Sequence, residues 1–248
     1  DEIIAFYPLD YHAYHEDHAS VAGALVAMRA RARARTYVKL AQAKTIRLFD
    51  VGTGDCRHFD DLKKYGCFDL NGIEISPEMV KTGRSRGYPV AQGTLENMNV
   101  TGFEKRFDLV TMYQLAEHTI EPQALFKKAF ALLRPGGYVL GQTPSMNSLE
   151  RRMAGCYWAG YHYPRHLQMF SRGGMGWLLG QAGFERISVK SALHLQAGLT
   201  LQNALVGGCG YRPRMRFGKV PIYSILLLVV APFCLLEYVL GQSGMMDF

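Results

Sequence analysis

The chain lacks the cysteine and repeat patterns that mark several classes of protein. Its five cysteines are odd in number and scattered, and no two have the CxxC spacing. No signal peptide opens the sequence, and it contains no internal repeat and no low-complexity tract. We therefore expect free thiols in a reducing compartment and a cytoplasmic protein. Because the first residue is Asp1 and not methionine, we also expect the natural N-terminus to lie upstream.

What the chain does contain is enough apolar sequence for a folded core. Of its 248 residues, 48% are hydrophobic and 20% are charged, as in globular rather than disordered proteins. The formal net charge is +7. A basic balance fits an anionic membrane surface, an acidic substrate or nucleic acid, and it does not choose between them.

Residues 1–45 are predicted to form an N-terminal helical lead. Four of its arginines alternate with alanines: Arg29, Arg31, Arg33 and Arg35. Spacing by two scatters charges around a helix, so a solvated helix is favoured over a dedicated anion site. Three histidines form an HxxHxxH pattern: His12, His15 and His18. On a helix they could share a metal, but we favour a solvated or lid-forming segment.

From Ile46 onward the sequence alternates between predicted strands and helices. The strands are expected at Ile46–Val51, Phe68–Ile75, Pro89–Ala91, Phe107–Tyr113, Tyr138–Thr143 and Phe184–Ala192. The helices are expected at 56–65, 77–86, 122–133 and 172–182. This alternation predicts an α/β fold: a Rossmann-like, doubly wound, mostly parallel sheet flanked by helices.

A glycine-containing turn after the first strand carries the most information. The strand ends in Asp50, the turn contains Gly52 and Gly54, and a helix follows. Glycine lets the backbone approach a ligand closely, because no Cβ intervenes. A second acid, Glu74, ends the next strand, where a carboxylate can accept hydrogen bonds from both hydroxyls of a ribose. Together the two features predict a nucleotide-type cofactor.

A nicotinamide dinucleotide is the weaker candidate for that cofactor. Its fingerprint GxGxxG needs a third glycine where this chain has Arg57, and no YxxxK pair occurs in the sequence. From about Ile46 to Ala192 the chain instead resembles the class I S-adenosylmethionine-dependent methyltransferases, in particular the branch of quinone-biosynthesis O-methyltransferases. The blocks that carry the resemblance are Asp50–Gly54, Gly72–Ser76, Gln92–Glu96, Phe107–Val110, Glu117-His118 and Leu132–Gly137.

The resemblance implies S-adenosyl-L-methionine as cofactor and a set of residues that bind it: Asp50, Gly52, Gly54, Glu74, Ile75, Thr94, Leu95, Tyr113 and Gln114. In this scheme the glycine turn cradles the methionine moiety and the acid of the second strand holds the ribose. The residues after the third strand flank the adenine, and those after the fourth close over the sulfonium. One departure is Cys56, where the family's turn usually has a further glycine. Its side chain either crowds the cofactor or points away, and we favour the second.

The end of the fourth strand is the expected place for the methyl acceptor. His118 is the first candidate for a general base, because imidazole titrates near neutrality; the alternative is a histidine that caps the following turn. In the related quinone methyltransferases this block supplies acidic and histidine ligands to a divalent cation. Here the first acid is replaced by Gln114, so we favour the absence of a metal site; Glu117 and His118 remain, which keeps a metal as the alternative.

A second cluster, Trp158–His166, lies between the fifth strand and the next helix. Its aromatic and cationic side chains are candidates for binding the acceptor: Tyr161, Tyr163 and Arg165. Its two histidines, His162 and His166, are candidates for moving a proton. The alternative is an aromatic loop that only packs.

The C-terminal stretch combines positive charge with an apolar run. Four basic residues precede it: Arg212, Arg214, Arg216 and Lys219. Residues 220–236 carry no charge, and Pro232 would kink a helix drawn through them. We favour a helical element attached to an anionic membrane surface; a buried or a dimer-forming helix is the alternative. In the family the sheet ends in a seventh, antiparallel strand, for which Met245–Phe248 is the candidate, and that would mean the chain is cut short.

These observations predict three regions: the lead at 1–45, a cofactor-binding domain at 46–195 and a basic, apolar appendage at 196–248. The function favoured is transfer of a methyl group to a small or lipid-like acceptor, such as a hydroxyl group, by a cytoplasmic protein peripheral to the inner membrane face. The alternative is a catalytically silent scaffold of the same fold. Nucleic acid is not expected as a partner, because no Asn-Pro-Pro-aromatic block follows the fourth strand. The oligomeric state stays open.

Overall fold

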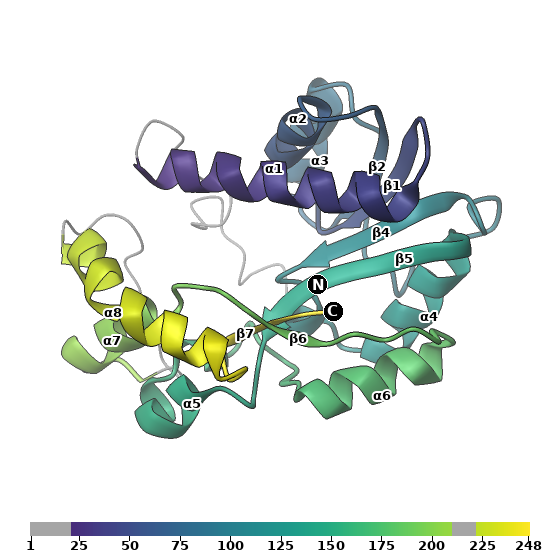
Figure 1. The fold of residues 1–248 in the computed structure, drawn as a ribbon. Coiled ribbons are helices and arrows are strands. Elements are labelled where there is room, and N and C mark those ends of the chain that lie inside the picture. Colours follow the sequence, from purple (N-terminus) through teal and green to yellow (C-terminus); the bar gives the residue numbers. More distant parts are fainter. Residues whose placement is uncertain (1–20, 210–221) are drawn as a thin grey trace. The chain divides into compact units, whose positions relative to one another are not determined.

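A computed structural model describes residues 21–209 and 222–248 (Figure 1). The predictions for His12, His15, His18 and for the basic residues 212–219 lie outside the described residues. The chain divides into two units. Within the described residues, unit 1 comprises 21–113 and 124–140, and unit 2 comprises 114–123, 141–209 and 222–248. The predicted boundaries at 45 and 195 stay predictions.

Unit 1 is built on parallel strands rich in apolar residues. β1 (Ile46–Val51) pairs with β2 (Phe68–Glu74) on one side and β4 (Phe107–Tyr113) on the other. β3 (Val90–Gln92) pairs with β2. β4 is buried along nearly its whole length, as expected for a strand covered on both faces. The carboxyl ends of these strands therefore meet at one edge of the sheet, as predicted from the alternation of elements.

Helices cover this part of the sheet: α1 (Val21–Ala41), α2 (Arg57–Lys63), α3 (Pro77–Ser85) and α4 (Pro122–Leu132) (Figure 1). α3 begins where Ser76 Oγ accepts a hydrogen bond from the N–H of Met79, with Pro77 at its first position. The core of unit 1 lies where apolar side chains of α1 and α2 meet the strands, among them Ala34, Tyr37 and Phe59.

An ion pair joins two of the sequence blocks in unit 1. The buried carboxylate of Asp108 in β4 accepts hydrogen bonds from the Arg134 guanidinium and from the N–H of Arg47, the latter at 2.8 Å. Burial alone would raise the pKa of Asp108, but these donors outweigh it and lower the pKa. Arg134 also donates to the carbonyl of Ala41 at 3.1 Å, which ties the end of α1 to the sheet.

Unit 2 holds the antiparallel part of the sheet. β5 (Leu133–Pro144) begins in unit 1 and ends in unit 2, where it pairs with β7 (Met245–Asp247), which in turn pairs with β6 (Lys190–Ala192). The strand order is β3-β2-β1-β4-β5-β7-β6. The seven-stranded, mostly parallel α/β sheet confirms the predicted fold class. β7 is the antiparallel strand for which Met245–Phe248 was the candidate.

The helices of unit 2 are α5 (Leu149–Ala154), α6 (Arg172–Ala182), α7 (Ala197–Leu205) and α8 (Ile222–Val239) (Figure 1). Short 3-10 turns occur at Ala116–His118, Gly155–Tyr157 and Ala159–Tyr161. α7 and α8 lie side by side and share an apolar contact of Ala197 with Val230 and Cys234. None of the helices in the described residues has the length and apolarity needed to cross a bilayer.

Two predicted strands differ in length from those observed. Phe184–Ala192 was expected to be one strand, but only Lys190–Ala192 pairs, because its neighbour β7 offers only Met245–Asp247 to pair with. β5 begins at Leu133 and not at Tyr138, directly after α4 ends at Leu132. The remaining predicted strands and helices agree with the observed ones to within two residues at each end.

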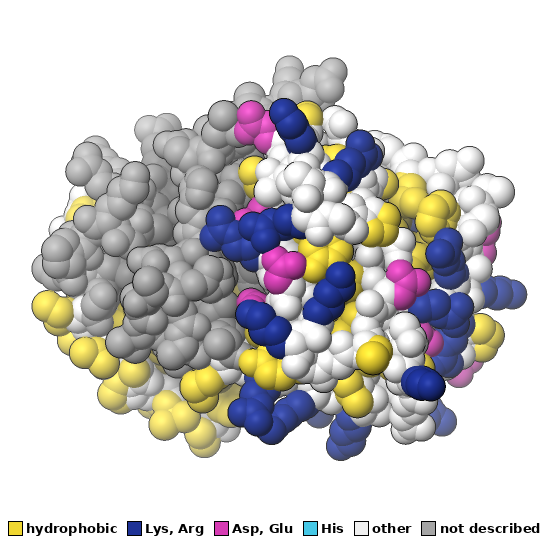
Figure 2. All heavy atoms as spheres, turned by 90° about the horizontal axis from the view of Figure 1, so that it is seen from above, with side chains coloured by type: hydrophobic (Ala, Val, Ile, Leu, Met, Phe, Trp, Pro, Cys, Tyr) yellow, Lys and Arg dark blue, Asp and Glu magenta, His cyan; other side chains and the backbone are white. Residues whose placement is uncertain are grey.

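The charged surface is mixed. On the described part of the face shown in Figure 2, Lys and Arg side chains stand among Asp, Glu and apolar side chains and do not form one continuous stripe.

Candidate functional site

The glycine turn of unit 1 has the backbone geometry that requires glycine. Gly52 and Gly54 have φ values of +81° and +52°, and the N–H of Gly52 donates to the carbonyl of Ile73 at 2.8 Å. A Cβ on Gly54 would meet no atom within 4 Å, so the space beside the turn is open. On the next strand a Cβ at Gly72 would lie 2.2 Å from Cγ2 of Thr53, which explains the glycine there.

The Glu74 carboxylate is hydrogen-bonded directly to this turn. Its Oε2 accepts the N–H of Gly54 at 2.9 Å, and its Oε1 accepts the N–H of Ser76 at 2.9 Å. The side chain is buried, and burial raises its pKa although the backbone donors act in the opposite direction. A carboxylate has about four acceptor positions. The backbone N–H groups of Gly54, Ser76 and Ile75 occupy part of this capacity, and the remainder is available to a ribose hydroxyl.

Asp50 is held by two residues that the sequence did not reveal. Thr111 donates its hydroxyl to Oδ1, and Nε2 of His58 lies 3.0 Å from Oδ2. Thr111 lies directly opposite Asp50 in the β1–β4 register, so knowledge of the strand order would have found it. His58 comes from the first turn of α2, and no spacing rule pointed to it.

The turn after β3 contains the two predicted adenine neighbours. The carbonyl of Thr94 accepts the N–H of Met98 at 3.0 Å, and Gly93 before it has φ +134°. Thr94 and Ile75 are partly buried, whereas the Leu95 side chain is fully buried. Leu95 therefore offers a ligand its backbone rather than its side chain.

Tyr113 at the end of β4 is packed by α1. The guanidinium carbon of Arg33 lies 3.7 Å from the centre of the Tyr113 ring, and the Tyr37 hydroxyl donates to the Tyr113 hydroxyl at 3.0 Å. Arg31 and Arg35 are exposed, as expected of a solvated helix. Arg33 departs from that expectation, because it shares a helix face with Tyr37, four residues on.

Cys56 points away from the turn. It has φ +62°, which explains why a glycine is usual at this position. Its side chain is fully buried, and a Cβ on Gly83 of α3 would lie 2.8 Å from its Sγ. Burial raises the pKa of the thiol to about 12. The side chain thus belongs to the core of unit 1 and does not crowd the turn.

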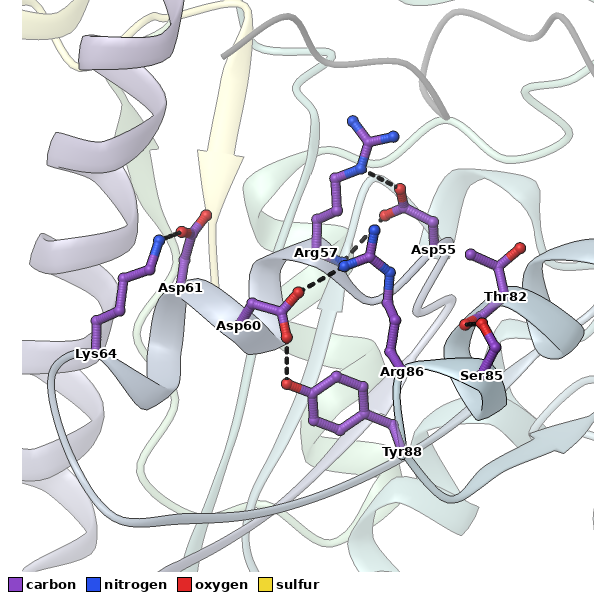
Figure 3. Close-up of polar contacts among 9 residues, drawn as sticks. All are labelled: Asp55, Arg57, Asp60, Asp61, Lys64, Thr82, Ser85, Arg86 and Tyr88. Carbon is purple, nitrogen blue, oxygen red and sulfur yellow. Dashed lines mark hydrogen bonds and ion pairs between the residues drawn. The ribbon is translucent and has the colours of Figure 1, made fainter.

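α2, which this turn opens, is anchored on its outer side. The Asp60 carboxylate accepts hydrogen bonds from Arg86 at 2.7 Å and from the Tyr88 hydroxyl at 2.6 Å (Figure 3). Arg57 pairs with Asp55 in the turn itself.

A hollow of about 320 Å³ among Phe49, Arg84 and Phe103 also lies in unit 1, but none of the predicted cofactor residues lines it.

Three side chains lie close together in unit 2. Two of them follow β4, and the third belongs to the cluster Trp158–His166. Ligand atoms of Glu117, His118 and His166 all lie within 4.8 Å of one another. The hydroxyl of Thr143 donates to Glu117 Oε2 at 2.8 Å, while Oε1 is buried and has no hydrogen-bond partner among the described residues. Burial raises the pKa of Glu117 to about 7. Gln114 donates its N–H to the carbonyl of Gln142 at 2.8 Å.

The histidine rings are oriented by backbone carbonyls. Nδ1 of His118 lies 2.9 Å from the carbonyl of Arg165, and Nδ1 of His166 lies 2.7 Å from that of Gly160. Carbonyls only accept, so both Nδ1 atoms carry protons and the lone pair of each neutral ring is on Nε2. Burial lowers the pKa of His118 to about 4 and also lowers that of His166. Both rings are neutral at physiological pH.

This grouping could hold a divalent metal. One carboxylate and two imidazoles are a common ligand set, and a backbone carbonyl on each Nδ1 is the usual support for a histidine ligand. Gln114 in place of an acid favours the absence of a metal, whereas His166, which is distant in sequence, adds a possible ligand beside Glu117 and His118. The absence of a metal stays a prediction.

The other residues of the second cluster lie around this grouping. Nη1 of Arg165 is 3.0 Å from Nε2 of the buried His162, whose ring centre is 5.1 Å from that of His166. The ring of Tyr161 packs edge-on against that of Trp158, with centres 5.0 Å apart. Tyr163 is the most exposed of the three predicted acceptor-binding residues, at 62%. The loop at 158–166 therefore contains both packed aromatic rings, such as Trp158 and Tyr161, and histidines that could move a proton.

Comparisons with known proteins agree with this geometry. Residues 25–189, more than half of the chain, match a family described as a methyltransferase domain. The ubiquinone biosynthesis O-methyltransferase of Proteus mirabilis is 27% identical over 107 residues, which cover 41% of this chain and 43% of that protein. That of Coxiella burnetii is 28% identical over 108 residues, covering 40% and 44%. The chain thus spans less than half of the length of these curated relatives.

Solved structures share the fold. A SAM-dependent methyltransferase from Archaeoglobus fulgidus has a TM-score of 0.57 at 15% identity and covers 89% of this chain and 92% of that chain. Phosphoethanolamine N-methyltransferase 2 of Haemonchus contortus, solved with S-adenosyl-L-methionine, has a TM-score of 0.58 at 16% identity, covering 87% and 51%. At these identities the likeness concerns the fold alone.

The residues of unit 1 fit S-adenosyl-L-methionine. The turn offers open space beside Gly54, and Glu74 keeps acceptor capacity at the end of β2. Cys56, the one departure from the usual pattern, is turned into the core. The family match, the fold and this turn lead to one conclusion: the chain belongs to the methyltransferase-domain family.

Proposed function

We propose that this protein transfers the methyl group of S-adenosyl-L-methionine to a hydroxyl group of a small, lipid-like phenol of the quinone-precursor class. The observation that carries the proposal is the link from Glu74 to the glycine turn, which supports binding of the nucleoside and methionine parts of the cofactor. The O-methyltransferases of ubiquinone biosynthesis among the relatives support a hydroxyl acceptor.

Methyl transfer from a sulfonium is an in-line displacement, so the acceptor must be positioned and its hydroxyl deprotonated. When bound, the cofactor supplies an electrophilic methyl group. The chain's own contribution is the neutral Nε2 of His118 or His166 as proton acceptor, with the Glu117 carboxylate within 4.8 Å of both rings. Above its pKa of about 7 the Glu117 carboxylate is ionised, and a negative charge at that separation favours the charged form of an imidazole. Tyr163 and Tyr161 are candidates for stacking on an aromatic acceptor.

Two measurements on the full chain test the proposal. The first is calorimetric titration of S-adenosylhomocysteine, which should bind saturably. The second is methyl transfer to a panel of ortho-dihydroxybenzenes with and without a prenyl tail. His118→Asn should lower kcat by about a hundredfold and leave the affinity for S-adenosylhomocysteine unchanged. The matched control Glu121→Gln changes an exposed acid four residues after Glu117 in the sequence and should keep full activity.

Binding of S-adenosylhomocysteine with no turnover on any acceptor would support the alternative, a silent scaffold of the same fold. That alternative has two grounds in the sequence, Cys56 in place of a glycine and Gln114 in place of an acid, and the buried position of Cys56 removes the first. Absence of binding to the well-folded chain would overturn the proposal as a whole.

A further inference from the structure

The outer face of α8 is apolar and exposed. Six of its side chains are each more than half exposed, with Leu228 the most exposed at 76%. They are Ile225, Leu228, Val229, Leu235, Leu236 and Val239. Their spacing of three, four and seven residues places them on one side of the helix. A contiguous apolar face of this kind on a folded protein marks a site of contact with a partner or a membrane.

The opposite face of α8 already has its contacts. Leu226, Val230 and Cys234 are buried, and Val230 and Cys234 belong to an apolar cluster with Ala197 of α7. An amphipathic helix at a protein surface normally turns polar side chains outward once its apolar face is packed. α8 is apolar on both faces, so packing within unit 2 does not explain its outer face.

The single charged residue of α8 is turned inward. Glu237 is 2% exposed, and its Oε1 accepts the N–H of Glu150 at 2.6 Å. The carbonyl of Glu237 accepts the N–H of Gln242 at 2.7 Å. An acidic group would normally be solvated, and here the fold buries it instead. The outer face consequently presents no charge that would oppose insertion into an apolar medium.

Cationic side chains stand at the C-terminal end of α8. The Arg152 guanidinium donates to Oε1 of Gln242, just beyond the helix, and Arg152 is exposed. Nη1 of Arg172 lies 3.6 Å from the position that a Cβ on Gly241 would take. In sequence, four further basic residues precede α8: Arg212, Arg214, Arg216 and Lys219. Basic groups beside an uncharged apolar helix face complement an anionic lipid surface.

We propose that the outer face of α8 docks on an anionic membrane surface, with the helix in the plane of the interface and its leucines among the acyl chains. Docking is a property of unit 2 and does not depend on the cofactor. Its use, the capture of a lipid-like acceptor from the bilayer, rests on the proposed function. A second copy of the chain, which has a formal net charge of +7, would account for the leucines but not for the arginines at the helix end.

The test is flotation of the full chain with vesicles of phosphatidylcholine and with vesicles that also contain phosphatidylglycerol. The intact protein should float with the mixed vesicles and bind those of phosphatidylcholine alone more weakly. The double variant Leu228→Ser with Leu235→Ser should weaken binding by about tenfold for each leucine. Arg152→Gln should weaken binding to the anionic vesicles by about fivefold. The matched control Trp177→Ser alters a side chain on α6 that is 63% exposed, and it should bind as the intact chain does.

Thermal unfolding of each variant shows whether it is folded, and light scattering reports the oligomeric state. Unchanged flotation of the folded leucine variant would overturn the proposal. So would an intact chain that binds neither kind of vesicle and forms a dimer that the leucine variant disrupts, because a second copy would then cover the face. Glu74→Ala separates the two proposals: it should weaken the binding of S-adenosylhomocysteine by about a hundredfold and leave flotation intact.

Discussion

Oε2 of Glu74 accepts a hydrogen bond from the N–H of Gly54 across 2.9 Å. This contact joins the acid at the end of β2 to the turn after β1, so the residue expected to hold the ribose also shapes the loop expected to hold the methionine moiety. The close approach of the two strands depends on Gly72, where a Cβ would lie 2.2 Å from Thr53. A change at Glu74 therefore acts on the cofactor directly and through the turn.

Glu74→Ala should weaken the binding of S-adenosylhomocysteine by about a hundredfold, because hydrogen bonds to a charged group contribute about 1.5–3 kcal/mol each. Calorimetric titration measures this. The control is Glu78→Ala, an exposed acid in the first turn of α3, which should bind the ligand normally. Equal affinities for the intact chain and Glu74→Ala would show that the ribose lies elsewhere.

Cys56→Gly should keep cofactor affinity and change the free energy of unfolding by no more than about 1 kcal/mol. Glycine relieves a left-handed backbone at φ +62°, and this gain offsets the lost burial of the thiol. Cys56→Val should destabilise by about 2 kcal/mol, because a β-branched side chain is strained at that φ. Urea unfolding measures both, with Cys67→Ser at an exposed cysteine as control. A stable valine variant would contradict the assigned backbone conformation.

Because of Glu150, the free energy of unfolding should decrease as the pH rises from about 5 to about 8. Burial raises its pKa from 4.5 to about 8, and the nearby Glu237 acts in the same direction. Between these two values the folded chain holds a proton that the unfolded chain releases, so the free energy of unfolding decreases as pH rises through this window. Glu150→Gln removes this dependence. Relative to the intact chain, it should gain about 3.5 kcal/mol on going from about pH 5 to about pH 8.

Urea unfolding at the two pH values measures this difference. Glu185→Gln is the matched control, because Glu185 is exposed and the same change there should not alter the pH dependence. An identical slope for the intact chain and Glu150→Gln would mean that Glu150 is ionised in the folded state.

Local sequence predicted most of the elements and the glycine turn and acid at the ends of the first two strands of unit 1. The strand ending in Asp50, the turn at Gly52 and Gly54, and the acid at Glu74 are each adjacent to a recognisable strand, and parallel strands end at the same edge. Helix 172–182 was predicted with its observed bounds, and in the structure Ser171 caps its start and Gly183 its end. Glycine and strand periodicity act over a few residues, so they can be read without knowing the fold.

Tertiary structure alone decided which distant side chains meet. His58 and Thr111 reach Asp50 from a helix and from a neighbouring strand, and His166 joins Glu117 and His118 from a loop far along the chain. Tertiary structure also decided that the Glu237 side chain of α8 is buried and accepts the N–H of Glu150. These contacts depend on strand order, register and the path of loops, which arise from packing of the whole sheet. Residue spacing along the chain carries no information about them.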